Sequence, residues 1–108
     1  MIDMKKLPLC PVETTLLVIG DKWKVLILRD LFLYGVQRFS ELKKSLHGVT
    51  QKMLTQQLRE LESDGVINRK VYPVVPPKVE YSLTELGQSL KPVVDAMWTC
   101  GEEFKKQA

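Results

Sequence analysis

The alternation of apolar and polar positions predicts a mainly helical chain with one short β-rich region. Residues 11–19 are predicted to form a first helix, because Pro11 suits the first helical position and Gly20 can end it. Residues 23–34 (WKVLILRDLFLY) are apolar on nearly every side, which is typical of a central helix surrounded by others. Asp21 can cap this second helix.

Two further helices are predicted with a very short turn between them. The third starts at Ser40, a residue type that caps helices well. The fourth follows Thr50 as its N-cap and stops at Gly65. Val49, just before this cap, can pack against Leu54 inside the helix, a contact that fixes the direction in which the chain enters.

Two β-rich stretches follow the fourth helix, namely residues 66–73 (VINRKVYP) and 79–83 (VEYSL). The Val-Val-Pro-Pro that comes between them predicts a hairpin with a stiff tip, since proline removes backbone donors and fixes the chain. Thr84 is then expected to cap a final helix, with Pro92 kinking it. This order of helices, short turn and hairpin predicts one winged helix-turn-helix domain over residues 1–108, mainly α with a small β-hairpin.

The fourth helix is the one expected to enter the major groove of DNA. Leu54, Leu58 and Leu61 share one of its faces, and the opposite face is polar, basic and free of carboxylates. Lys and Arg donate to guanine edges or phosphates, Gln can pair with adenine, and Thr can meet the thymine methyl group. The residues expected to contact bases are Gln51, Lys52, Thr55 and Gln56. Those expected at the DNA backbone or at an anion-attracting helix start are Arg38, Ser40, Lys43, Lys44, Thr50, Arg59, Arg69, Lys70 and Lys78.

The composition agrees with a folded domain, and the distribution of charge agrees with phosphate contact. The 108-residue chain is 44% hydrophobic and 27% charged. Its net charge is only +3, but residues 38–59 hold five basic residues against one acid. A solvated charged face is the common alternative to a phosphate-binding surface. No apolar run reaches the roughly 18 residues of a membrane span, and the start lacks a signal-peptide core, so we expect a cytoplasmic protein without a membrane partner.

Few residues could support chemistry beyond DNA binding. Two cysteines and one histidine fall short of a four-ligand zinc site, and no nucleophile elbow or phosphate-binding glycine loop occurs. We therefore expect neither an enzyme nor a cofactor. Cys10 lies at a helix start near Lys5 and Lys6, which favours a reactive thiolate; a small packed side chain is the alternative. Cys100 is expected only to pack.

The final helix is also expected to join two copies of the chain. If it runs from residue 85 towards 106 it is roughly 33 Å long, comparable with the width of the domain. Its overhanging apolar stripe would be covered in a homodimer, or alternatively by the first two helices of the same chain. The expected interface residues are Leu16, Leu90, Val93, Val94, Met97, Trp98 and Phe104. Two-fold symmetry then predicts a near-palindromic operator with half-sites a multiple of about 34 Å apart.

Three blocks of the sequence closely resemble the HxlR-type regulators: CPVETTLLVIGDKWKVLIL, then RFSELKKSLHGVTQKMLTQQLRELESDGVI, then YPVVPPKVEYSLTELGQSL. The resemblance implies a bacterial or archaeal homodimer, a repressor or an activator, whose first and last helices pair across the two-fold axis. It implies that residues 51–58 read double-stranded DNA in successive major grooves and that Lys78 lies on the wing. It also places Cys10 where some relatives carry a thiol that senses small electrophiles or oxidants. With no second cysteine near the reading helix, a disulfide switch is not favoured.

The main competing class is a winged-helix module that binds only proteins, because a fold does not fix a function. Such a module would be expected to lack the basic, carboxylate-free face that Lys52, Gln56 and Arg59 supply here. This face therefore favours DNA as the partner.

Overall fold

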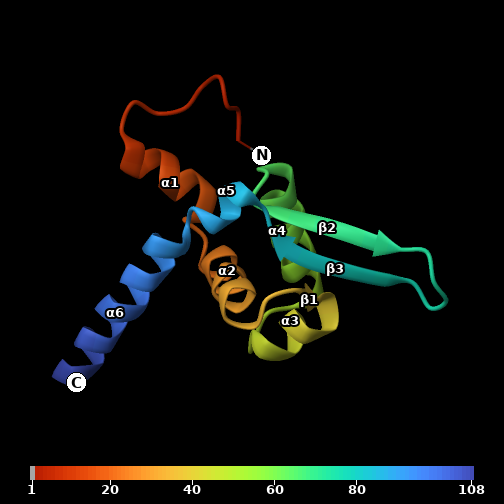
Figure 1. The fold of residues 1–108 in the computed structure, drawn as a ribbon. Helices are drawn as coiled ribbons and strands as arrows, with labels where there is room; N and C mark the ends of the chain where they lie inside the picture. Colours follow the sequence, from red (N-terminus) through yellow and green to blue (C-terminus); the bar gives the residue numbers. More distant parts are fainter. Residues whose placement is uncertain (1) are drawn as a thin grey trace.

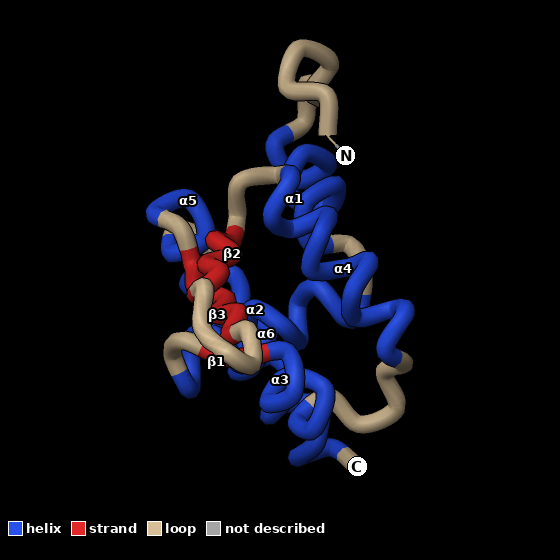
Figure 2. The backbone as a smooth tube through the Cα atoms, turned by 90° about the vertical axis from the view of Figure 1, so that its right-hand side faces the viewer, coloured by secondary structure: helices blue, strands red, loops and turns tan. Residues whose placement is uncertain are grey.

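The structure, a computed structural model that describes residues 2–108, has six helices and three strands in those residues. They are α1 (Pro11–Ile19), α2 (Lys22–Tyr34), β1 (Gln37–Arg38), α3 (Phe39–Ser45), α4 (Gln51–Ser63), β2 (Ile67–Tyr72), β3 (Lys78–Leu83), α5 (Glu85–Gln88) and α6 (Lys91–Gln107). The β2–β3 hairpin and α6 project from opposite sides of the helical body (Figure 1). All three strands lie together on one side of the domain, with α1 and α4 on the other (Figure 2).

The core lies where α2, α3 and α4 meet the root of the hairpin. Its fully or nearly fully buried side chains include Ile27, Leu28, Leu31, Leu42, Leu46, Val49, Leu54, Leu58, Leu61, Val66, Ile67 and Tyr81. The three leucines of α4 recur at helical spacing, so one face of this helix is anchored in the core while the other stays outside. The predicted inward face of α4 is thereby confirmed.

Local sequence signals set the ends of α4 as predicted. The Thr50 hydroxyl accepts the Met53 backbone N–H at 3.1 Å. At the other end Gly65 has a positive φ of 78°, and the Val66 N–H reaches back to the Leu61 carbonyl oxygen at 2.9 Å. This is the helix ending in which a glycine adopts the left-handed conformation that other residues avoid.

The start of α3 differs from the prediction, which placed the N-cap at Ser40. The helix begins at Phe39 with Arg38 as the N-cap residue, and Ser40 lies inside the first turn. The Glu41 carboxylate accepts the Arg38 backbone N–H at 2.9 Å. A carboxylate reaching back from the first turn stabilises a helix start without a hydroxyl at the cap, and this reciprocal bond fixes the boundary.

The predicted single final helix kinked at Pro92 is also wrong, because the structure has two helices. Thr84 does cap the first of them, with its hydroxyl accepting the Gly87 N–H at 3.0 Å, but α5 ends at Gln88. The second, α6, starts afresh at Lys91, so Pro92 occupies its first turn. Proline lacks a backbone donor and therefore fits a helix start better than a helix interior.

The hairpin has a third strand that the sequence did not indicate. Strand order is β1-β3-β2, all antiparallel, with Gln37 opposite Tyr81 and Arg38 opposite Glu80. This short pairing ties the segment before α3 to the root of the hairpin. Both α3 and α4 therefore contact the sheet that carries the wing.

Candidate nucleic-acid interface

The outward face of α4 is a polar surface on an element whose other face is anchored in the core. Gln51, Lys52, Gln56 and Arg59 are exposed along it, and Thr55 at its flank is half-buried. These side chains lie opposite the buried leucines, so the anchored face holds the helix while the polar face stays free. The four base-contact residues expected from the sequence therefore share one accessible surface.

The carboxylate of Glu60 lies beside this face, and a lysine of the neighbouring helix α2 pairs with it. The Lys24 ammonium on α2 lies 3.2 Å from the Glu60 carboxylate, with the lysine side chain only 10% exposed and the glutamate 33%. The pair joins α2 to α4 and removes a negative charge from the edge of the surface. No local pattern predicts this pair, because the partners are 36 residues apart.

The expected phosphate-contact residues on α3 and at its start lie outside the core. Arg38, Ser40, Lys43 and Lys44 are all exposed, while Leu42 between them is fully buried. Five residues, 46–50, join α3 to α4, so the exposed basic residues of α3 precede the polar face of α4 by one short turn. A basic edge beside a polar helix is the arrangement that backbone contact to a duplex requires.

A hollow of about 310 Å³ separates α4 from the hairpin. Its lining comes from Thr55, Leu58, Arg59 and Glu62 of α4 and from Arg69 and Tyr81 of the strands. The expected cations Arg59 and Arg69 therefore face the same space from two elements. Arg69 is exposed, so the hollow connects the polar face of α4 with the wing.

The outer half of the hairpin carries a cluster that sequence reasoning missed. The ammonium groups of Lys70 and Lys78 each lie 4.9 Å from the centre of the Tyr72 ring. Lys78 also lies 3.4 Å from the Glu80 carboxylate. A hydrogen bond from Tyr72 is the main cause that lowers the pKa of Glu80 below its usual 4.5. Burial opposes it, and a hydrogen bond from Lys78 and the charges of Lys78 and Arg38 lower the pKa further. The charge of Lys78 is thus partly offset within the chain.

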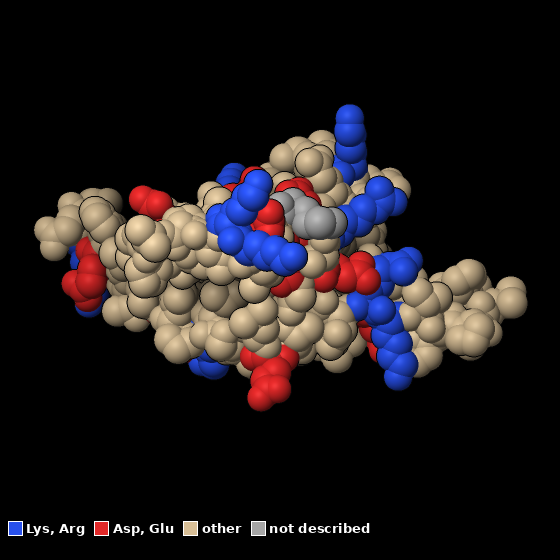
Figure 3. Space-filling model, turned by 90° about the horizontal axis from the view of Figure 1, so that it is seen from above, with Lys and Arg blue, Asp and Glu red and all other residues tan. Residues whose placement is uncertain are grey.

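Charged side chains stop short of the wing tip. In Figure 3 basic and acidic groups gather at the root of the projecting hairpin, and the end of the projection carries neither. The uncharged end is residues 73–77, Pro-Val-Val-Pro-Pro. The tip is therefore an apolar knob beyond a basic shaft.

A second apolar surface, formed by α1 and α6, includes most of the expected dimer residues. Leu16, Met97 and Phe104 are exposed, with Phe104 at 73%. Trp98 is also exposed, but it lines a separate hollow against α2 with Phe32 and Leu33. Leu90 and Val93 are partly buried against the core. Val94 is only 8% exposed and packs inside its own chain, so it does not belong to this surface.

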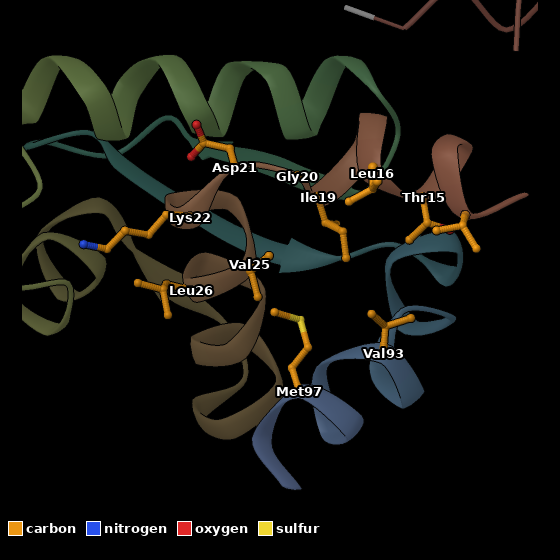
Figure 4. A pocket seen from close by; sticks show the side chains of 11 residues that line it. Thr15, Leu16, Ile19, Gly20, Asp21, Lys22, Val25, Leu26, Val93 and Met97 are labelled. Atoms are coloured by element: carbon orange, nitrogen blue, oxygen red, sulfur yellow. The ribbon is translucent and has the colours of Figure 1, made fainter. Parts of the chain in front are cut away.

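Between α1, α2 and α6 this apolar surface sinks into a hollow of about 710 Å³. Figure 4 shows Ile19, Val25 and Met97 pointing toward one another in it, while the ends of Asp21 and Lys22 point away. The hollow is thus apolar inside. The first two helices leave much of the α6 stripe uncovered.

The two thiols are both exposed. Cys10 is the residue before α1, and its side chain caps no backbone N–H there. Cys100, expected only to pack, instead faces outward from α6. No group of three or more His, Cys, Asp or Glu side chains in residues 2–108 could hold a metal ion, and no helix in that range is long and apolar enough to cross a membrane.

Comparison with known proteins agrees with this geometry. The family model described as HxlR-like helix-turn-helix matches residues 18–108. The uncharacterized HTH-type transcriptional regulator YdeP of Bacillus subtilis is 58% identical over 96 residues, which cover 89% of this chain and 74% of YdeP.

Two solved structures show the same winged-helix fold. The HTH-type transcriptional regulator ytcD is 55% identical, with a TM-score of 0.84 over 91% of this chain and 99% of that one. The redox regulator HypR in its oxidized form is 53% identical, with a TM-score of 0.82 over 87% of this chain and 96% of that one. The chain belongs to the HxlR-like helix-turn-helix family of transcriptional regulators.

Proposed function

We propose that this regulator binds a specific, near-palindromic operator in double-stranded DNA as a homodimer, in the cytoplasm. The observation that carries the proposal is the polar face of α4, which is exposed, basic and opposite three buried leucines. A helix of this kind fits the major groove, where each base pair presents a distinct set of donors and acceptors.

The residues divide into two roles. Gln51, Lys52, Thr55 and Gln56 lie in the first half of α4 and face outward, which suits base contact. The residues proposed to contact the DNA backbone, or to lie beside it, are Arg38, Ser40, Lys43, Lys44, Thr50, Arg59, Arg69, Lys70 and Lys78. Backbone contacts position the protein and make binding depend on salt, while base contacts select the sequence.

Selection of bound sequences from random duplex DNA tests the proposal directly. We expect one enriched near-palindromic sequence with half-sites a multiple of about 34 Å apart. Gln56→Ala should weaken binding to that sequence by about 1–3 kcal/mol and relax the preference at one position. Lys43→Ala, the matched control, should weaken specific and random DNA alike and lower the salt dependence by about one counterion. Failure of the wild type to enrich any sequence would instead favour a protein-binding module.

The homodimer rests on the apolar surface of α1 and α6. An apolar stripe this exposed is unfavourable in water, and a two-fold partner that offers the same surface would cover it. Sedimentation at micromolar concentration should give twice the 12.4 kDa mass of the chain. A monomer under those conditions would contradict this part of the proposal.

The proposed regulatory site is the Cys10 thiol, which an oxidant or small electrophile would modify. Its support is the exposure of Cys10 at the start of α1, within the proposed dimer region, and the similarity to a protein described as a redox regulator. We expect diamide to weaken operator binding by the wild type and by Cys100→Ser, but not by Cys10→Ser. An unchanged response of Cys10→Ser would remove Cys10 from the mechanism.

A further inference from the structure

The tip of the hairpin, residues 73–77, is an exposed apolar knob that the core does not need. Val75 is fully exposed at 100% and Val74 is 51% exposed. Three of the five residues are prolines, which fix the backbone and leave little conformational freedom to lose on binding. A stiff apolar projection of this kind is suited to contact with a partner.

The charge around the tip favours a nucleic acid as that partner. Arg69 and Lys70 precede the tip and Lys78 follows it, whereas Glu80 is the single acid between residues 67 and 83. Glu80 is already bound by Tyr72 and Lys78. The shaft is therefore positive, and an acidic surface on either side of the tip would be attracted to it.

The hairpin continues the surface through which α4 is proposed to bind DNA. Arg69 and Arg59 line one hollow, so the root of the hairpin lies beside the reading helix. Val75 follows Arg69 by six residues, and at about 3.3 Å per residue the tip can lie up to about 20 Å away. Half a turn of duplex DNA is about 17 Å, the separation between a major groove and the next minor groove. The hairpin is thus long enough to place its tip there.

We infer that the apolar tip is a wedge that enters the minor groove beside each half-site and partly opens a base step. The inference rests on the proposed function and deepens it. A B-form minor groove is only about 6 Å wide, and apolar side chains that enter it unstack and bend the duplex. The tip would therefore select for deformable flanking sequence at positions where it makes no hydrogen bond.

The test uses the selected operator with 2-aminopurine, a base whose fluorescence rises on unstacking, placed at successive flanking positions. Wild-type protein should raise the fluorescence at one flanking step of each half-site. The double variant Val74→Ser/Val75→Ser should abolish that rise and bind the operator about tenfold more weakly. Val71→Ser is the matched control, because Val71 is a half-exposed valine on the shaft of the same hairpin. It should behave as the wild type.

A second measurement identifies the groove. Replacing flanking guanines by inosine removes an amino group from the minor groove and leaves the major-groove edge unchanged. This replacement should tighten binding by the wild type and leave the double variant unaffected. Both substitutions lie at the exposed tip, so circular dichroism should show an unchanged fold.

The possible results distinguish failure of operator binding from failure of the minor-groove wedge. If no duplex is bound specifically, the proposed function fails. If the operator is bound but the double variant matches the wild type in affinity and fluorescence, only the wedge is refuted. If the double variant binds DNA normally yet loses regulation in a transcription reaction, the tip contacts a protein and the wedge is equally refuted.

Discussion

Gly87 lies where α5 meets the start of β2, and one added methyl group there should be costly. A β-carbon at this position would overlap the Val66 carbonyl oxygen and lie 3.1 Å from the Leu83 Cδ2 atom. The same carbonyl oxygen accepts the Thr84 backbone N–H at 3.1 Å, with the Thr84 hydroxyl 3.0 Å away. Gly87→Ala must therefore push α5 away from Val66 and disturb the junction between the wing and the last two helices.

Three contributions set the magnitude. Overpacking against backbone costs about 1–3 kcal/mol, here near the upper end because a carbonyl cannot rotate away. Weakening of the hydrogen bonds to Val66 adds about 1 kcal/mol. The higher helix propensity of alanine than of glycine stabilises the variant by about 1 kcal/mol and offsets part of this loss. The free energy of unfolding should fall by about 3 kcal/mol, which lowers the melting temperature by roughly 15 °C.

Urea unfolding, followed by circular dichroism at one fixed protein concentration, measures this loss. Fixed concentration matters because a dimer gains stability from its own association. The matched control is Gln88→Ala, an exposed position in the same short helix, which should stay within about 0.5 kcal/mol of the wild type. A Gly87→Ala protein as stable as the wild type would refute the close approach of α5 to Val66.

Three further outcomes are expected. Thr50→Ala should cost about 1 kcal/mol of unfolding free energy in the same assay and Thr50→Ser much less, since serine keeps the capping oxygen. Tyr72→Phe should raise the pKa of Glu80 toward 4.5, because the hydrogen bond from the Tyr72 phenol lowers it in the wild type. This bond stabilises the wing above pH 4.5, and the stabilisation is lost as the pH falls through the lowered pKa. Carboxyl NMR measures the pKa, and an unchanged value would rule the bond out. Phe104→Asp should yield a monomer by sedimentation, whereas an intact dimer would exclude α6 from the interface.

Sequence alone identified those features whose cause is local. The cap at Thr50 and the glycine ending at Gly65 depend on residues within one turn, so propensity and pattern predict them. The outward face of α4 could be predicted in the same way, because the helical period that places the leucines inward also places the polar residues outward. At Ser40 the same reasoning failed, since Glu41 bonds back to the backbone before it and moves the helix start.

Features that depend on distant partners could not be predicted. The close approach of Gly87 to Val66 joins residues 21 positions apart in the chain, and no local pattern indicates it. The Lys24–Glu60 pair and the short strand β1 likewise join segments separated by dozens of residues. Val94 has the apolar character of an interface residue, and only its packing shows that its own core uses it.

The break between α5 and α6 allows a small rotation at residues 89 and 90 to move the far end of α6 by a larger distance. With 17 residues α6 is about 25 Å long, and it runs outward from the body (Figure 1). A rotation of about 5° at Ser89 and Leu90 would displace its far end by roughly 2 Å. In the proposed homodimer two such arms act in opposite directions, so a small torsion at one joint becomes a larger change in the spacing of the two reading helices. The half-site separation that the dimer accepts would then depend on the junction between α5 and α6, which contacts no base.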